Sequence, residues 1–133
     1  MIRVVLALVL FAHGVGHSMG PLQVFNVATI NPQWHGDSWL LGGLGASATQ
    51  VVGLVLWAVS LVGFAAVAGV VMGWLPADWW VPLALGSAVA SIGGVILFPT
   101  AFPTFSTIGA LVIDLAVIVA VAWYHWTPAQ LGA

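Results

Sequence analysis

The sequence predicts an all-α fold, an integral membrane four-helix bundle with one long extramembrane loop between its first two helices. Of the 133 residues, 62% are hydrophobic and 3% are charged, whereas soluble domains carry about a quarter charged residues. The chain also contains four mostly apolar stretches of about 20 residues, the length that an α-helix needs to cross a bilayer. We therefore expect a single transmembrane domain over residues 1–133, with the lipid bilayer as its main partner.

The expected spans cover about residues 2–20, 48–74, 81–98 and 105–126. The interval 21–47 is rich in Asn, Gly and Pro, which favour turns and contact with water, so we expect it to be the long loop. Pro82 falls in the first turn of the third span, where a missing N–H is tolerated. Pro99 and Pro103 flank the turn that leads into the fourth span.

The composition excludes several classes of partner and chemistry. Only Arg3, Asp37, Asp78 and Asp114 are charged, with a formal net charge of -2, so the chain has no basic surface for nucleic acid. The absence of cysteine excludes disulfides and iron–sulfur ligation, and the absence of lysine excludes a Schiff base. Because Arg3 is the only basic side chain, the positive-inside rule predicts that both termini lie in the cytoplasm.

Tryptophans and small residues suggest how the spans sit and pack. Seven tryptophans fall near expected span ends, where indole rings favour the headgroup boundary: Trp34, Trp39, Trp74, Trp79, Trp80, Trp123 and Trp126. Small residues recur at four-residue spacing in three spans: Ala12, Gly16 and Gly20; Ala65, Gly69 and Gly73; Gly86, Ala90 and Gly94. We expect these rows to pack the helices of one bundle closely, and a homo-oligomer is a further expectation.

Three ionisable residues of the spans form the main candidate site. His13 and His17 are four residues apart and share one face of the first helix. Asp114 lies in the middle of the fourth span, where a carboxylate usually faces the bundle interior and has a partner. Counted from the loop end, Asp114 lies roughly 13 Å deep, His13 roughly 11 Å and His17 roughly 5 Å. The three side chains are therefore expected to share one layer, with His13 beside Asp114.

Other polar residues fall near this layer. Gln50 and Trp57 lie in the same half of the second span, and His35 lies in the loop that covers this end, so all three are candidates for ligand or proton handling. The hydroxyl residues of the spans are interpreted differently, because serine and threonine in helices commonly bond to their own backbone. This interpretation places Ser60, Ser87 and Ser91 among packing residues.

The layer has several chemical uses that the sequence leaves open. A neutral histidine bonded to Asp114 would compensate a buried carboxylate and hold two helices together. His13, His17 and Asp114 also match the two-histidine, one-carboxylate set that binds Fe, Zn or Cu. A histidine beside a carboxylate can alternatively handle protons or a small ligand. The remaining use is one histidine bound to one face of a haem or chlorophyll supplied within a larger complex.

The first helix carries a resemblance to a known family. The run from Ile2 and Arg3 through Phe11, Ala12, His13, Gly14, Val15, Gly16 and His17 resembles the opening of small bacterial DoxX-like four-helix membrane proteins. The resemblance covers the four-span plan and about 20 residues at the amino end. It implies a bacterial inner-membrane location and, from some relatives, a link to quinone-coupled redox complexes. The chain lacks the lysine that often follows the first glycine-rich segment of that group.

These observations lead to one expected function with two alternatives. We expect a non-catalytic protein that works as an accessory subunit of a larger membrane complex or in a homo-oligomer. The first alternative is a metal- or quinone-dependent redox enzyme, or its membrane subunit, that uses the same layer. The second alternative is a small proton-coupled carrier.

Overall fold

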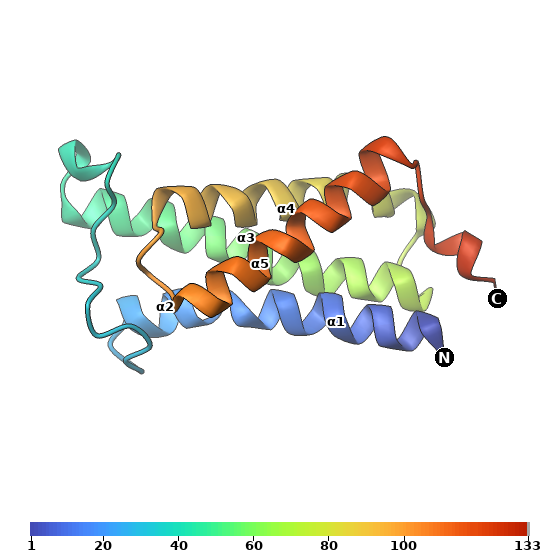
Figure 1. The fold of residues 1–133 in the computed structure, drawn as a ribbon, viewed down its shortest axis with the longest axis horizontal. Coiled ribbons are helices and arrows are strands. Elements are labelled where there is room, and N and C mark those ends of the chain that lie inside the picture. The colour runs from blue at the N-terminus through green and yellow to red at the C-terminus, as the bar shows by residue number, and fades with distance from the viewer. Residues whose placement is uncertain (133) are drawn as a thin grey trace.

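The computed structural model describes residues 1–132, and these residues form an all-helical bundle. Its α-helices are α1 (Ile2–Gly16), α2 (Met19–Val24), α3 (Ala46–Met72), α4 (Trp80–Leu97) and α5 (Thr104–Ile118). The shorter elements are η1 (Gly42–Leu44), η2 (Ala77–Trp79), η4 (Pro128–Leu131) and the π-helical turn η3 (Val119–Trp123), which continues α5. The long helices run side by side along the molecule (Figure 1). The predicted fold class is confirmed.

Residues 1–132 contain four helical stretches that are long and apolar enough to cross a membrane. They cover Ile2–Val24, Ala46–Met72, Ala77–Leu97 and Thr104–Trp123. Each matches an expected span with ends that differ by a few residues. The fourth stretch ends at Trp123, because the chain leaves the helix there and His125 adopts a φ of 50°.

The first span is broken between α1 and α2. Pro21 has no N–H, so it cannot donate to the carbonyl of His17 four residues earlier, and that carbonyl instead accepts from Gly20. The N–H groups of His17 and Ser18 bond three residues back, to Gly14 and Val15, which tightens the end of α1. The break lies directly after His17, one of the candidate site residues.

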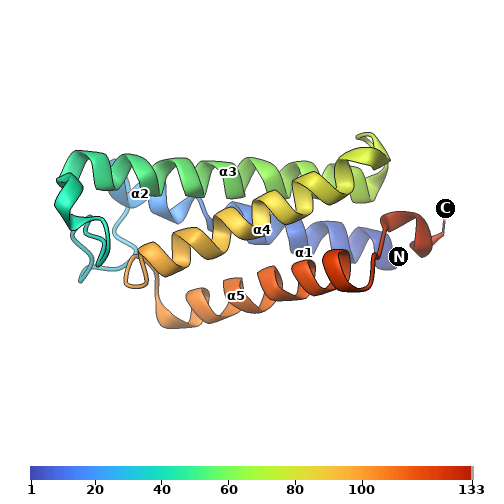
Figure 2. The ribbon, with the colours of Figure 1, turned by 90° about the horizontal axis from the view of Figure 1, so that it is seen from above.

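Figure 2 shows α3 and α5 on opposite sides of the bundle, with α1 and α4 between them. α1 packs along α3, α3 along α4, and α4 along α5, whereas α1 and α5 approach each other less closely. The amino end of α1 and the last segment lie at the same end of the bundle, where Arg3 donates to the carbonyl of Gly132 at 2.8 Å (Figure 1). The loop 25–45 covers the opposite end (Figure 1).

Glycines allow close approach at several helix contacts. A Cβ on Gly14 would lie 2.9 Å from the Cβ of Phe64, so α1 and α3 approach each other closely beside the candidate site. A Cβ on Gly20 would lie 2.3 Å from the Trp57 ring. The expected rows of small residues are only partly used in this way, because Gly16 and Gly86 have no atom within 4 Å of a Cβ position.

The loop end is closed by an aromatic cluster and by hydrogen bonds from the loop. The Trp57 ring contacts those of Trp34, Phe98 and Phe102, and Trp34 also contacts Phe98, with centroids 5.2 to 6.4 Å apart. The loop also bonds to the end of α4, since Ser38 donates to the carbonyl of Leu97 at 2.6 Å. These contacts fix the loop over the half of the bundle that holds the candidate site.

The seven tryptophans expected at the membrane boundary differ in exposure, and Trp126 is half-buried. Four that the sequence placed at the membrane boundary are exposed: Trp39, Trp74, Trp79 and Trp123. Trp34 and Trp80, which were expected at the same boundary, are instead 8% and 3% exposed. Both rings are buried because each makes a T-shaped contact with another indole and donates its N–H to a backbone carbonyl, that of Asp37 for Trp34 and that of Trp126 for Trp80.

Candidate functional site

The predicted contact between the first and fourth spans is present. His13 Nε2 lies 2.8 Å from Asp114 Oδ1, and this pair joins α1 to α5. Asp114 is 0% exposed, and His13 is buried as well. The expectation that equal depth would bring these two residues together is confirmed.

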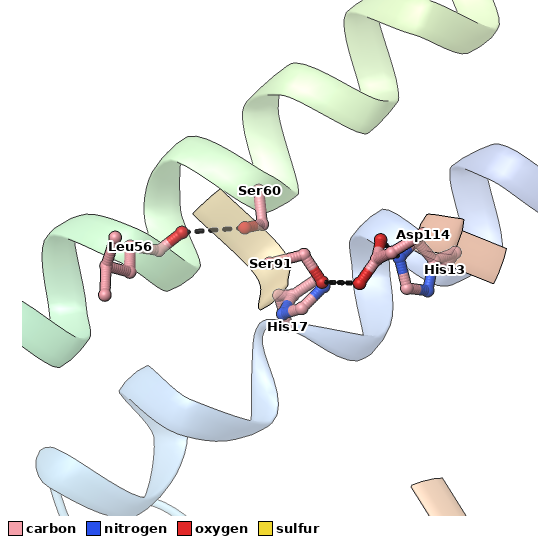
Figure 3. Close-up of polar contacts among 6 residues, drawn as sticks. All are labelled: His13, His17, Leu56, Ser60, Ser91 and Asp114. Atoms are coloured by element: carbon pink, nitrogen blue, oxygen red, sulfur yellow. Dashed lines mark hydrogen bonds and ion pairs between the residues drawn. The ribbon is translucent and has the colours of Figure 1, made fainter. Parts of the chain in front are cut away.

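His17 joins the same group through a residue of α4. Ser91 Oγ donates to Asp114 Oδ2 at 2.5 Å and lies 3.0 Å from His17 Nε2. Figure 3 shows Ser91 between the His17 ring and the carboxylate, with His13 on the other side of Asp114. The four side chains, from three helices, form one hydrogen-bonded chain that runs His13, Asp114, Ser91, His17. We call these four residues the polar cluster.

Ser91 corrects the sequence interpretation. Its hydroxyl was expected to bond within its own helix, as Ser60 does by donating to the carbonyl of Leu56 at 2.8 Å (Figure 3). Ser91 bonds across the bundle instead. The depth of Ser91 could have indicated this contact. Ser91 lies six residues from the end of α4, roughly 9 Å from the loop end, and is therefore close to the level of His13.

The hydrogen-bond directions follow from the chemistry of serine. A hydroxyl carries one hydrogen, and Ser91 gives it to Asp114 Oδ2. The contact between Ser91 and His17 therefore requires His17 Nε2 to be the donor. Both carboxylate oxygens of Asp114 have a partner, one in His13 and one in Ser91.

The local sequence explains why the cluster is buried. Asp114 and Val117 are the buried residues of α5, so this face of α5 turns toward the bundle and the rest of the helix remains on the outside. The His13 ring contacts the edge of Phe64 on α3 at a centroid distance of 4.5 Å, and it lies 5.1 Å from the His17 ring. The close approach at Gly14 brings α1 and α3 near enough for this contact.

The ionisable groups of the polar cluster are linked by hydrogen bonds. Within residues 1–132, no group of three or more histidine, aspartate or glutamate side chains is arranged to hold a metal ion. His13 contacts Asp114 directly, but the serine hydroxyl lies between Asp114 and His17. His13, His17 and Asp114, the residues suggested as a metal site, thus come together with Ser91 as a hydrogen-bonded chain.

The remaining sequence candidates lie outside the polar cluster. Gln50 and His35 line a polar cavity of about 440 Å³ beneath the loop. Trp57 is 1% exposed and belongs to the aromatic cluster at the same end, where its indole N–H has no hydrogen-bond partner within the described chain. Asp37 is exposed in the loop, as predicted.

Comparisons with known proteins add no relationship to this description. No family model, curated protein or solved structure matches the chain.

Proposed function

We propose that this chain is a small non-catalytic protein of the bacterial inner membrane that acts as an accessory subunit, in a homo-oligomer or in a larger membrane complex. Four apolar spans joined by short connections and one loop leave little of the chain outside the bilayer. The resemblance of the first helix to DoxX-like proteins supports the bacterial location. The single basic residue, Arg3, supports cytoplasmic termini through the positive-inside rule.

One observation carries the non-catalytic part of the proposal. Asp114 is 0% exposed and both of its oxygens are engaged, by His13 and Ser91. A carboxylate held in this way compensates its own burial and connects α1, α4 and α5, which is the structural use of a buried polar group. The polar cluster is thus accounted for by assembly of the bundle.

The subunit role is tested by the assembly state in a bilayer. The full chain is expressed in a bacterial membrane, crosslinked there, and then purified in mild detergent for native mass spectrometry. The proposal expects a defined oligomer or a stoichiometric membrane partner, which the crosslinks also capture. Monomer alone, both in the crosslinked membranes and in several detergents, would contradict the proposal.

A second candidate, proton-coupled transport, is favoured by one specific observation. His13 and His17 line a cavity of about 400 Å³, so the hydrogen-bonded chain borders a space that a small solute can occupy. In proteoliposomes, Asp114→Asn is then expected to abolish proton-linked flux, whereas Asp78→Asn, a change in an exposed turn, is expected to leave it intact. Equal flux in the two variants would end this candidate.

A further inference from the structure

A cavity lies between α1 and α5. It measures about 400 Å³, a size within the usual range for a small-molecule site. It exists because α1 packs along α3 and α5 packs along α4, so α1 and α5 approach each other less closely than these pairs do. The small residues Gly16, Gly109 and Ala110 line it and leave room between the helices.

The cavity has a polar wall formed by two histidines. His13 and His17 both line it, and each is more than nine-tenths buried. Each ring bonds through Nε2, to Asp114 and Ser91 respectively. Within residues 1–132, neither Nδ1 atom has a hydrogen-bond partner, and neither is among the fully buried unpaired atoms, so both are accessible.

The charge balance of the polar cluster determines whether each of these two Nδ1 atoms is a hydrogen-bond donor or an acceptor. An uncompensated charge inside a bilayer is costly, so His13 and Asp114 together favour a neutral total. Two arrangements satisfy this condition: an imidazolium beside a carboxylate, or a neutral imidazole beside a carboxylic acid that donates to Nε2. In both arrangements the Nδ1 of His13 carries a hydrogen and is a donor.

The Nδ1 atom of His17 is a hydrogen-bond acceptor, in contrast to that of His13. The Nε2 atom of His17 already donates to Ser91, and within residues 1–132 no carboxylate pairs with the ring to compensate a second proton. The neutral ring therefore leaves Nδ1 as an acceptor. The two ring centroids are 5.1 Å apart, a spacing at which one hydroxyl group can contact both rings.

The cavity continues into an apolar groove along the same two helices. A second cavity of about 400 Å³ lies between α1 and α5 and shares Val9 and Ile113 with the first. Its lining is almost entirely apolar and runs from Ile113 to Trp126. From His13 to Leu6, α1 advances roughly 10 Å along this groove. The combined space thus has one polar end and a long hydrocarbon-like continuation.

We propose that this space binds a neutral amphiphile with a hydroxyl headgroup, whose tail lies in the apolar groove. The hydroxyl oxygen accepts from His13 Nδ1, and its hydrogen is donated to His17 Nδ1. A carboxylate headgroup fits less well, because it lacks a hydrogen for His17 and would lie near Asp114. This inference goes beyond the subunit role, because binding requires no partner protein.

The test uses 1-dodecanol as the probe, with dodecane and dodecanoate as comparison ligands. The full chain is labelled with ¹⁵N-histidine in lipid nanodiscs, and long-range ¹H–¹⁵N spectra report each ring nitrogen. We expect dodecanol to shift the Nδ1 resonances of His13 and His17 in a saturable way and to leave His35 and His125 unchanged. Dodecane and dodecanoate are expected to produce no such shift.

Filling the cavity provides the matched control. Gly109 and Gly86 are both helical glycines with no atom within 4 Å of a Cβ position, but only Gly109 lines the cavity. We expect Gly109→Leu to remove the dodecanol shift and Gly86→Leu to retain it. Ala110→Leu serves as a second blocking variant if Gly109→Leu does not fold.

Several results would overturn the proposal. A shift of equal size with dodecane would show that only apolar filling is sensed. A preference for dodecanoate would contradict the donor and acceptor assignment. Retention of the dodecanol shift in a folded cavity-filling variant would place binding elsewhere, as would absence of any shift in the unmodified protein.

Discussion

Ser91 should contribute more to stability than any buried hydroxyl that bonds within its own helix. Ser91→Ala removes a donor to Asp114 and an acceptor for His17 and leaves both groups, which are 0% and 5% exposed, without that partner. Hydrogen bonds between membrane helices average about 0.6 kcal/mol and reach about 1.7 kcal/mol in measured cases. With two bonds lost, we expect the free energy of unfolding to fall by about 1 to 3 kcal/mol.

Ser60 provides the matched control for this prediction. It is also a serine with 0% exposure in a spanning helix, but its hydroxyl donates to Leu56 four residues earlier. Ser60→Ala is expected to change the free energy of unfolding by no more than about 0.5 kcal/mol, because the Leu56 carbonyl lies within a helix that supplies its own bonds.

The assay is reversible unfolding in mixed micelles, in which an increasing fraction of denaturing detergent unfolds the protein and tryptophan fluorescence reports the transition. Ser91→Ala should unfold at a clearly lower detergent fraction than Ser60→Ala. If the two variants unfold together, the hydrogen bonds of Ser91 do not stabilise the bundle, and the structural interpretation of the polar cluster is wrong.

Three further predictions concern packing, metal content and the chain ends. Gly20→Ala should destabilise the protein by about 1 to 3 kcal/mol, because the added methyl group overlaps the Trp57 ring. Gly16→Ala meets no atom within 4 Å and should not destabilise it. Equal stability of the two variants in the same unfolding assay would refute this prediction. The purified protein should hold no stoichiometric transition metal by elemental analysis, and a metal that is lost in His13→Ala would overturn the accessory-subunit proposal. Arg3→Gln should increase hydrogen exchange in the C-terminal segment by removing donors to its backbone carbonyls, and unchanged exchange would contradict this role.

The sequence was sufficient to predict the spans and the contact between His13 and Asp114. Both predictions rest on strong physical constraints, since apolar length defines a span and a buried carboxylate requires a partner at its own depth. Ser91 escaped prediction because a helical serine has two alternatives of similar energy, its own backbone or a neighbouring helix. Only the rotation of α4 about its axis, which depends on packing, decides between them.

The same limit applies to the tryptophans and to the cavity. Position near a span end indicated a boundary location for Trp34 and Trp80, yet both rings are buried because a tertiary partner was available. The space between α1 and α5 depends on which helices are neighbours, and periodicity within one helix does not contain that information. The donor and acceptor roles of the histidines likewise followed only after Ser91 was located.

The bonds of Arg3 have a consequence for how this protein sits in a bilayer. Its guanidinium, the only basic side chain of the chain, is directed to backbone carbonyls of the last segment. The chain offers anionic lipids no second lysine or arginine side chain, and its vertical position depends on exposed indoles, Trp39 at one end and Trp74, Trp79 and Trp123 at the other. The tilt of the bundle should accordingly follow the thickness of the surrounding bilayer and be nearly indifferent to the charge of its lipids.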